Sequence, residues 1–246
     1  MRRLPEALAV LVVLLQVAYP LTVGPARHAL TVVTVCVFFA ASVSHAVVHR
    51  GVAWAAAFVV VTVGAGFAAE AVGTATGVPF GAYAYAGTLG PRLLDVPLVI
   101  PLAWAMFGYP ALLVGQRLAG SATGAALLGG AALASWDLFL DPMMVGDGHW
   151  AFASPTPALP GAPGIPLTNY AGWLLVAVLM LGLLQLLPRL DADDRQPAAL
   201  FLWTWAGSVV ANAVFLGRPI VALVGGVAMG SVALPYAQAL RTGVSR

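Results

Sequence analysis

Three carboxylic acids stand in or beside long apolar stretches, where an ionisable side chain is costly and marks a candidate functional site. They are Glu70, Asp137 and Asp141. Asp137 and Asp141 are four residues apart, which places them on one face of a helix. Each acid comes near the carboxyl end of its expected helix, whose partial negative charge opposes ionisation. We therefore expect at least one of them to hold a proton near neutral pH and to serve as a general acid.

Amide and aromatic side chains accompany these acids. Asn169 opens a later apolar stretch and Asn212 approaches the end of another, both expected at the membrane face where the acids lie. Aromatic rings occur in the same segments: Phe80, Tyr83, Tyr85, Trp104, Trp136, Trp150, Tyr170 and Trp173. Ring faces attract cations, so this cluster suits a site in which a carbocation forms. The alternative is an ordinary aromatic belt at the membrane interface.

The acids also have simpler explanations. A proline follows Asp141, so this residue could cap a new helix that begins at the proline. Arg92 or Arg218 could neutralise Glu70. The spacing of the two aspartates is similar to the magnesium-diphosphate motifs of membrane prenyltransferases, but no second acidic motif or basic diphosphate contact accompanies it.

Two further polar groups are weaker candidates. His45 and His49 have the spacing of a metal-binding pair, but no third ligand is evident, so we expect an interfacial or packed pair and no metal. The segment Asp147–Trp150 could form a proton relay or a polar turn. No glycine-rich phosphate loop or dinucleotide fingerprint occurs in a strand–turn–helix context, and no cofactor is predicted.

The composition sets the class of protein that positions these groups. Only 11 basic and 9 acidic residues occur among 246, whereas a soluble domain of this length carries about 60 charges. Apolar residues make up 61% of the chain, and the mean hydropathy is +0.94. A soluble globular fold is therefore excluded. Scattered arginines form no nucleic-acid-binding stripe, and the absence of lysine excludes a retinal Schiff base.

Eight apolar runs are long enough to span a bilayer as helices. They lie near residues 4–23, 29–48, 52–72, 96–118, 122–140, 170–187, 198–216 and 219–240. The sequence thus predicts one all-α integral-membrane domain over residues 1–246, with no room for a soluble domain. The first run is longer than the apolar core of a signal peptide and is expected to be a retained helix.

Eight crossings separate the arginines by membrane face. One face would receive Arg2, Arg3, Arg50, Arg117, Arg189, Arg195, Arg241 and Arg246, and the other only Arg27, Arg92 and Arg218. The positive-inside rule places the first face and both termini in the cytoplasm. The acids then lie near the non-cytoplasmic face of the cell membrane.

Two long connections, near residues 73–95 and 142–168, belong to that non-cytoplasmic face. They are rich in Gly, Pro and aromatic residues and poor in charge, which favours compact lids or re-entrant segments over a cavity, rather than ordinary interfacial loops. Each connection ends in an aliphatic-Pro-Leu-x5-Trp pattern, 96–104 and 165–173. This repeated pattern predicts that the third and fourth helices and the fifth and sixth helices form parallel halves of one site.

Residues 65–180 resemble the integral-membrane carotenoid hydratases of carotenoid biosynthesis, of the γ-carotene and bisanhydrobacterioruberin hydratase types. The first matching block runs from Glu70 through Gly73, Pro79-Phe80-Gly81, Tyr83, Tyr85, Gly90-Pro91 and Val96-Pro97-Leu98 to Trp104. Two later blocks match as well, Asp137-x3-Asp141-Pro142-Met143 with Trp150, and Gly164-Ile165-Pro166-Leu167-x-Asn169-Tyr170-x-Gly172-Trp173.

The resemblance implies cofactor-free addition of water to the terminal C1,C2 double bond of an acyclic C40 or C50 carotenoid, through a tertiary carbocation. One acid would protonate C2 and another would activate water, with Asp137 or Asp141 favoured as the acid and Glu70 as the base, and the reverse assignment as the alternative. Asn169 would orient the water or a carboxylate, and the aromatic residues would line the cation. The substrate would arrive from membrane lipid, and other enzymes of the pathway are possible partners. A carotenoid cyclase and a carotenoid or lipid carrier without chemistry are the alternatives.

Overall fold

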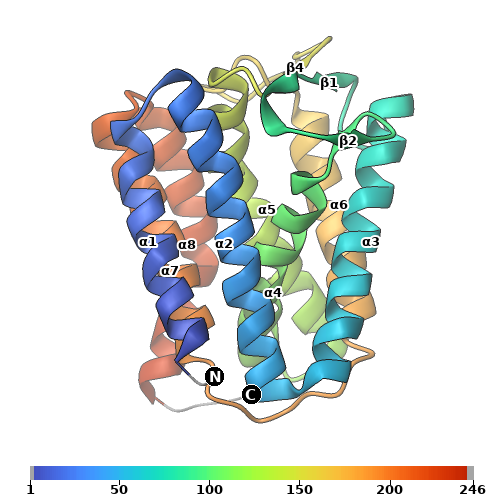
Figure 1. Cartoon of the computed structure of the whole chain (residues 1–246), viewed down its shortest axis with the longest axis vertical. Coiled ribbons are helices and arrows are strands. Elements are labelled where there is room, and N and C mark those ends of the chain that lie inside the picture. The colour runs from blue at the N-terminus through green and yellow to red at the C-terminus, as the bar shows by residue number, and fades with distance from the viewer. Residues whose placement is uncertain (1–2, 243–246) are drawn as a thin grey trace.

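The computed structural model describes residues 3–242, which form a single up-and-down bundle of helices (Figure 1). The eight long helices are α1 (Leu4–Ala18), α2 (Gly24–Arg50), α3 (Val52–Thr76), α4 (Val99–Leu118), α5 (Ala122–Gly146), α6 (Leu167–Leu184), α7 (Arg195–Val210) and α8 (Pro219–Thr242). Short 3-10 turns follow α1 (Tyr19–Leu21) and precede β2 (Gly87–Leu89), and a π-helical turn, η3 (Ala211–Phe215), extends α7. Eight helical segments in this range are long and apolar enough to cross a membrane, which confirms the predicted all-α membrane fold.

Local sequence explains where the helices begin and end. Proline occupies the first turn of α1 and of α2, where its missing N–H leaves no partner unsatisfied. The side chain of Ser121 caps α5 by accepting a hydrogen bond from the amide of Gly124. Gly77 caps the end of α3, and its φ of 77° is a left-handed conformation that glycine adopts without strain.

Two helices are longer than the apolar pattern suggested. α3 continues four residues beyond Val72 to Thr76, so Glu70 lies nearly two turns before its end. α5 continues through Pro142 to Gly146, and its N-cap is Ser121. The alternative that Asp141 caps a new helix is therefore wrong: Asp141 lies inside α5.

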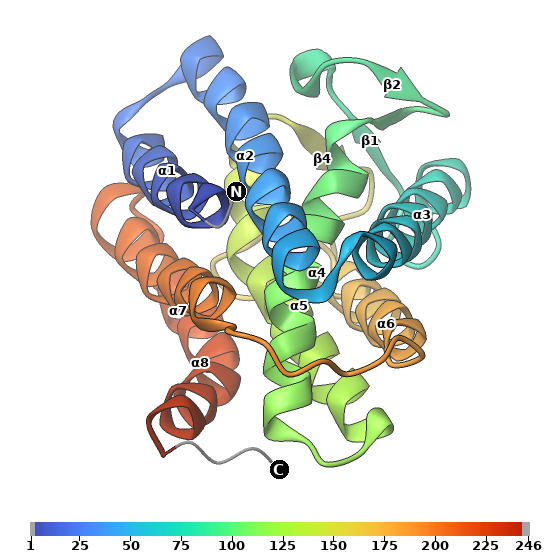
Figure 2. The same ribbon diagram turned by 60° about the horizontal axis from the view of Figure 1, so that its bottom comes forward.

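α4 is the central helix and is almost wholly buried (Figure 2). It contacts α2, α3, α5, α6, α7 and α8. Its close approach to α5 depends on Gly115, because a Cβ there would lie 2.1 Å from the carbonyl oxygen of Ala125. The outer helices expose many large apolar side chains, as expected of a surface in contact with lipid.

The two long connections cover one end of the bundle, the upper end in Figure 1. Strand β1 (Tyr83–Tyr85) pairs antiparallel with β4 (Trp150–Phe152), so that Tyr83 faces Phe152 and Tyr85 faces Trp150. Strands β2 (Arg92–Leu93) and β3 (Val96–Pro97) form a second small ladder. The prediction of compact, packed segments is confirmed, although the strands were not expected. We call residues 77–98 and 147–166 together the lid.

The arginines sort by end as the eight crossings require. Within the described range, the lid end carries Arg27 in the first turn of α2, Arg92 in β2 and Arg218 just before α8. At the opposite end, Arg3, Arg50, Arg117, Arg189, Arg195 and Arg241 flank helices and the linker of residues 185–194, so we call this the linker end. Arg2 and Arg246, which the sequence assigns to the same face, lie outside the described residues.

Candidate active site

Glu70 is buried in α3 beneath the lid and accepts three hydrogen bonds. The hydroxyls of Tyr83 and Tyr85 donate to Oε2 over 2.5 Å and 2.7 Å, and the indole Nε1 of Trp104 donates to Oε1 over 3.0 Å. The two tyrosines are two residues apart on strand β1, which turns both side chains to the same face. Every one of these contacts uses Glu70 as an acceptor, which is the hydrogen-bonding pattern of an ionised carboxylate.

The tyrosines keep their protons in this arrangement. Burial, followed by the charge of Glu70, raises the pKa of both Tyr83 and Tyr85 above the ordinary value of 10. Both hydroxyls therefore remain donors at neutral pH and hold the Glu70 carboxylate in one position.

Asp137 and Asp141 form a second acidic group, one helical turn apart on α5. The side-chain amide of Asn169, from the first turn of α6, donates to Asp137 Oδ2 over 2.9 Å and also to Asp141 Oδ2. All three side chains are buried, and Asp137 Oδ1 has no hydrogen-bond partner within residues 3–242. One amide thus holds the two carboxyl groups side by side.

No cation neutralises these acids in the described part of the chain. Its ion pairs join Arg27 to Asp147, Arg50 to Asp194, and Arg195 to Asp193. The alternative in which Arg92 or Arg218 neutralises Glu70 is therefore wrong.

Aromatic rings enclose the space beside the acids. Trp104 and Trp173 stack with ring centroids 3.9 Å apart and planes at 14°, and Phe80 lies 6.4 Å from Trp104 between centroids. These two tryptophans end the repeated aliphatic-Pro-Leu-x5-Trp pattern, so the two copies of the pattern meet at one cavity. Gly66 makes room for the stack, because a Cβ there would lie 2.8 Å from the ring of Trp104.

A cavity joins the acids to the aromatic rings. Its lining comprises Glu70, Phe80, Tyr83, Tyr85, Ile100, Ala103, Trp104, Leu140, Asp141, Trp150, Phe152, Asn169 and Trp173. The volume is about 30 Å³. Because one water needs roughly 10–15 Å³, the cavity has room for about two waters.

Most of the site residues predicted from the sequence line this cavity, and three of them, Asp137, Trp136 and Tyr170, do not. Asp137 is reached through Asn169, and Trp136 packs behind the site with its ring 6.2 Å from Trp173. Tyr170 is half-buried, and its hydroxyl has no partner among residues 3–242.

The cavity also contains side chains that the sequence reasoning missed, namely Ile100, Ala103, Leu140 and Phe152. Ile100 and Ala103 precede Trp104 by four and one residues on α4. The helical spacing between Ile100 and Trp104 was the available signal.

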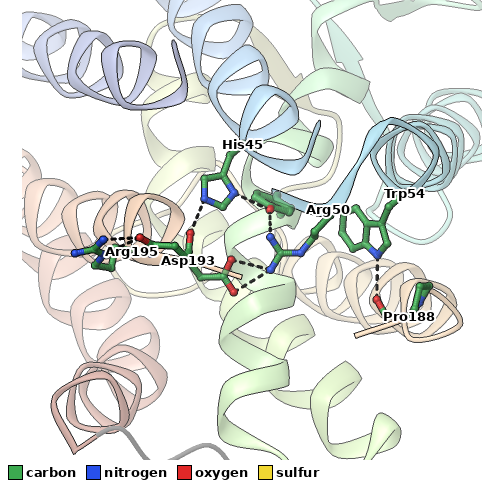
Figure 3. A network of polar contacts seen from close by, with 8 residues as sticks. His45, Arg50, Trp54, Pro188, Asp193 and Arg195 are labelled. Carbon is green, nitrogen blue, oxygen red and sulfur yellow. Dashed lines mark hydrogen bonds and ion pairs between the residues drawn. The ribbon is translucent and has the colours of Figure 1, made fainter. Parts of the chain in front are cut away.

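His45 and His49 lie at the linker end, far along α2 from the lid, and form a packed pair as expected. Their rings stack with centroids 4.3 Å apart. His45 also contacts the hydroxyl of Tyr109 and the carbonyl oxygen of Asp193, in a network where Arg50 pairs with Asp194 (Figure 3). No group of three possible metal ligands occurs within residues 3–242.

The remaining polar candidates stabilise the lid or a helix end. Asp147 accepts hydrogen bonds from Tyr19 and Arg27, and the His149 ring contacts Thr88. Of the segment Asp147–Trp150, only Trp150 lines the cavity. Asn212 lies in η3, donates to the carbonyl of Ser208, and does not line the cavity either.

Comparison with known proteins bears on what this arrangement does. The chain is 41% identical over 120 residues to a bisanhydrobacterioruberin hydratase from Haloarcula japonica, a match that covers 45% of this chain and 39% of that relative. Less than half of the relative's length is thus represented. No solved structure matches the chain. The family model described as "Carotenoid biosynthesis protein" matches residues 30–234, and the chain therefore belongs to this carotenoid biosynthesis family.

Proposed function

We propose that the chain is a carotenoid hydratase that adds water to the terminal C1,C2 double bond of an acyclic carotenoid end group. The observation that carries this proposal is that Asp141 and Glu70 line the same cavity. Asp141 belongs to a pair of buried aspartates without a cation among residues 3–242, and Glu70 is held by three hydrogen-bond donors. Family membership and the hydratase relative support the same reaction class.

The aspartate pair is the proton donor in this proposal. Two buried carboxyl groups held side by side, without a cation, are stable when they share one proton. Asp141 lines the cavity, so it delivers this proton to C2 of the alkene, and the electron pair of the double bond forms the new C–H bond. Asp137 and Asn169 are positioning residues that keep Asp141 aimed at the substrate.

The resulting positive charge at C1 needs stabilisation and a nucleophile. Trp104, Trp173 and Phe80 present rings to the cavity, and ring faces attract a cation. A cavity water adds to C1 and transfers one proton to Glu70, so that the product is a tertiary alcohol. A second water then returns that proton to the aspartate pair, and no cofactor is required.

The carotenoid reaches this site from the bilayer in our proposal. The cavity is too small for an end group, so the lid moves when the polyene enters. The arginine distribution supports a lid on the non-cytoplasmic side of the cell membrane. Replacing Cys36 with serine and adding single cysteines at exposed Ala84 or Asp191 allows a test with a membrane-impermeant maleimide on intact cells. Labelling at 84 and protection at 191 is expected, and the reverse would contradict the orientation.

Expression in a lycopene-accumulating host, followed by mass analysis of the pigments, tests the reaction. A gain of one water per reacted end group is expected. Cyclised ends of unchanged mass would indicate a cyclase instead, and unchanged pigment would indicate a carrier or a different substrate.

Conservative substitutions of the acids distinguish a hydratase from a carotenoid carrier that performs no chemistry. Glu70→Gln and Asp141→Asn should lower hydration by about 10²–10⁴-fold, the usual contribution of a general acid or base. Asp191→Asn is the matched control, because Asp191 is exposed in the linker far from the cavity. A carrier would tolerate all three substitutions.

A further inference from the structure

A second, larger cavity opens at the linker end of the bundle, away from the proposed active site. It has a volume of about 490 Å³ and lies between α8 and the ends of α4 and α5. Its lining comprises Arg117, Leu118, Leu128, Ser231, Val232, Pro235, Gln238, Ala239 and Thr242. Figure 2 shows the end of α8 standing apart from α4 and α5 at this place.

The cavity is an elongated groove along one face of α8. Its lining residues on α8 recur at intervals of three, four and seven residues, from Ser231 to Thr242. Eleven residues of helix correspond to roughly 16 Å, so the groove runs inward from the helix end over about half of a hydrocarbon core. Its inner part is bordered by Leu128, Val232 and Pro235, which are apolar.

The outer part of the groove carries an uncompensated cation. Arg117 lies in the last turn of α4 and donates from Nη2 to the carbonyl of Ala239 over 3.2 Å. Its Nε is buried without a hydrogen-bond partner, and Arg117 forms no ion pair with any residue from 3 to 242. Among residues 3–242, no carboxylate lines the groove. No acid among residues 3–242 balances the charge of this guanidinium, so an anion in the groove would supply the missing counter-charge.

We infer that this groove binds an anionic phospholipid, with the phosphate at Arg117 and an acyl chain along α8. Gln238 and Thr242 lie at the same end of the groove as Arg117 and offer polar contacts to the headgroup. Basic pockets between membrane helices suit acidic headgroups, and Arg3, Arg189 and Arg241, which form no ion pair among residues 3–242, add a favourable field at the linker end. The inference does not depend on the reaction proposed for the lid end.

Thermal unfolding of the detergent-purified full chain tests this site. Phosphatidylglycerol should raise Tm by several degrees, because a ligand that binds only the folded state stabilises it. Phosphatidylcholine and inorganic phosphate should each give a much smaller rise, since one lacks the net negative charge and the other lacks the acyl chain. An equal rise with either of them would overturn the inference.

Two variants, with a third as control, test whether the rise in Tm comes from lipid bound in this groove. Arg117→Gln should lose the rise caused by phosphatidylglycerol, whereas Arg241→Gln should keep it, because Arg241 is exposed in the last turn of α8 and does not line the groove. Ser231→Trp should also lose the rise by filling the inner groove, while all charges remain. Ser231 is exposed, so this variant decides the question if Arg117→Gln does not fold. A full rise in both variants would place the lipid elsewhere.

Discussion

The indole of Trp104 stacks on that of Trp173, and Trp104 also donates a hydrogen bond to Glu70, a proposed catalytic acid. The ring centroids are 3.9 Å apart, and Nε1 of Trp104 donates to Glu70 over 3.0 Å. The two residues come from parallel helices, α4 and α6, which both begin at the lid. Trp104, Trp173 and Phe80 form what we call the aromatic wall of the cavity, and the hydrogen bond from Trp104 connects this wall to Glu70, the proposed base.

Phenylalanine substitutions separate the two roles of this stack. Trp104→Phe keeps an aromatic face but removes the hydrogen bond to Glu70, which is worth about 1.5–3 kcal/mol when one partner is charged. Hydration should fall roughly 10–100-fold. Trp173→Phe removes ring area alone and should cost less. Pigment analysis of the two variants, normalised to protein in the membrane, makes the comparison, and equal losses would contradict the role of the hydrogen bond.

The tyrosine pair offers an independent measurement at the same carboxylate. Tyr83→Phe and Tyr85→Phe each remove one donor to Glu70 Oε2 and leave the other in place. Each single variant should lose about tenfold in hydration, and the double variant should lose more than the product of the single losses, because Oε2 then has no donor. Strictly multiplicative losses would show that the two hydroxyls do not act on a shared atom.

The pH dependence of stability should report on the lid. Burial, followed by the neighbouring His28, lowers the pKa of His149 from 6.5 to about 4. The unfolded chain therefore binds a proton at a higher pH than the folded protein does. This contribution to stability is complete above about pH 6.5 and is lost as the pH falls towards 4.

Tm measured between pH 7 and pH 5 checks this expectation. His149→Asn cannot titrate and should show a smaller fall in Tm than the wild type. His49→Asn, at the exposed linker end, should keep the contribution of His149. An unchanged pH slope in His149→Asn would show that the lid histidine is not responsible.

The linker end should affect stability without affecting chemistry. Asp194 accepts two hydrogen bonds from Arg50, over 2.7 Å and 2.9 Å, and the Arg50 side chain is only 3% exposed (Figure 3). Asp194→Asn leaves this guanidinium without its charged partner and should cost about 1–3 kcal/mol of stability. Arg195→Gln breaks the exposed pair with Asp193 and should cost less than about 1 kcal/mol. Hydration per folded molecule should be unchanged in both, since the cavity lies at the other end.

Helical spacing predicted the acid pair, but the lid contacts depend on pairing between distant segments. Asp137 and Asp141 share a face because they are four residues apart, and helix direction brings Glu70 to the same end. The register that sets Tyr85 opposite Trp150 joins strands 65 residues apart in sequence, and no local pattern specifies it. Hence the two tyrosine donors to Glu70, which lie on strand β1, could not be assigned.

The rotation of each helix was also hard to assign, because the helices are apolar on nearly every side. Asn169 and Trp173 are four residues apart and both line the cavity. Tyr170 follows Asn169 by one residue, which turns it about 100° around the helix. The same displacement separates Trp136 from Asp137. Proximity in sequence to a site residue was therefore a weaker guide than helical spacing.

Gly66 and Gly64 of α3 provide a matched pair for testing how tightly the aromatic wall is packed. A Cβ at Gly66 would lie 2.8 Å from the Trp104 ring, whereas nothing lies within 4 Å of a Cβ at Gly64. Gly66→Ala should displace Trp104, cost about 1–3 kcal/mol of stability and lower hydration. Gly64→Ala gains helix propensity of up to about 1 kcal/mol and should leave hydration unchanged. Because both variants add one methyl group to the same helix, a difference in hydration between them would come from the position of Trp104. Equal activity would mean that the stack can shift without disturbing Glu70.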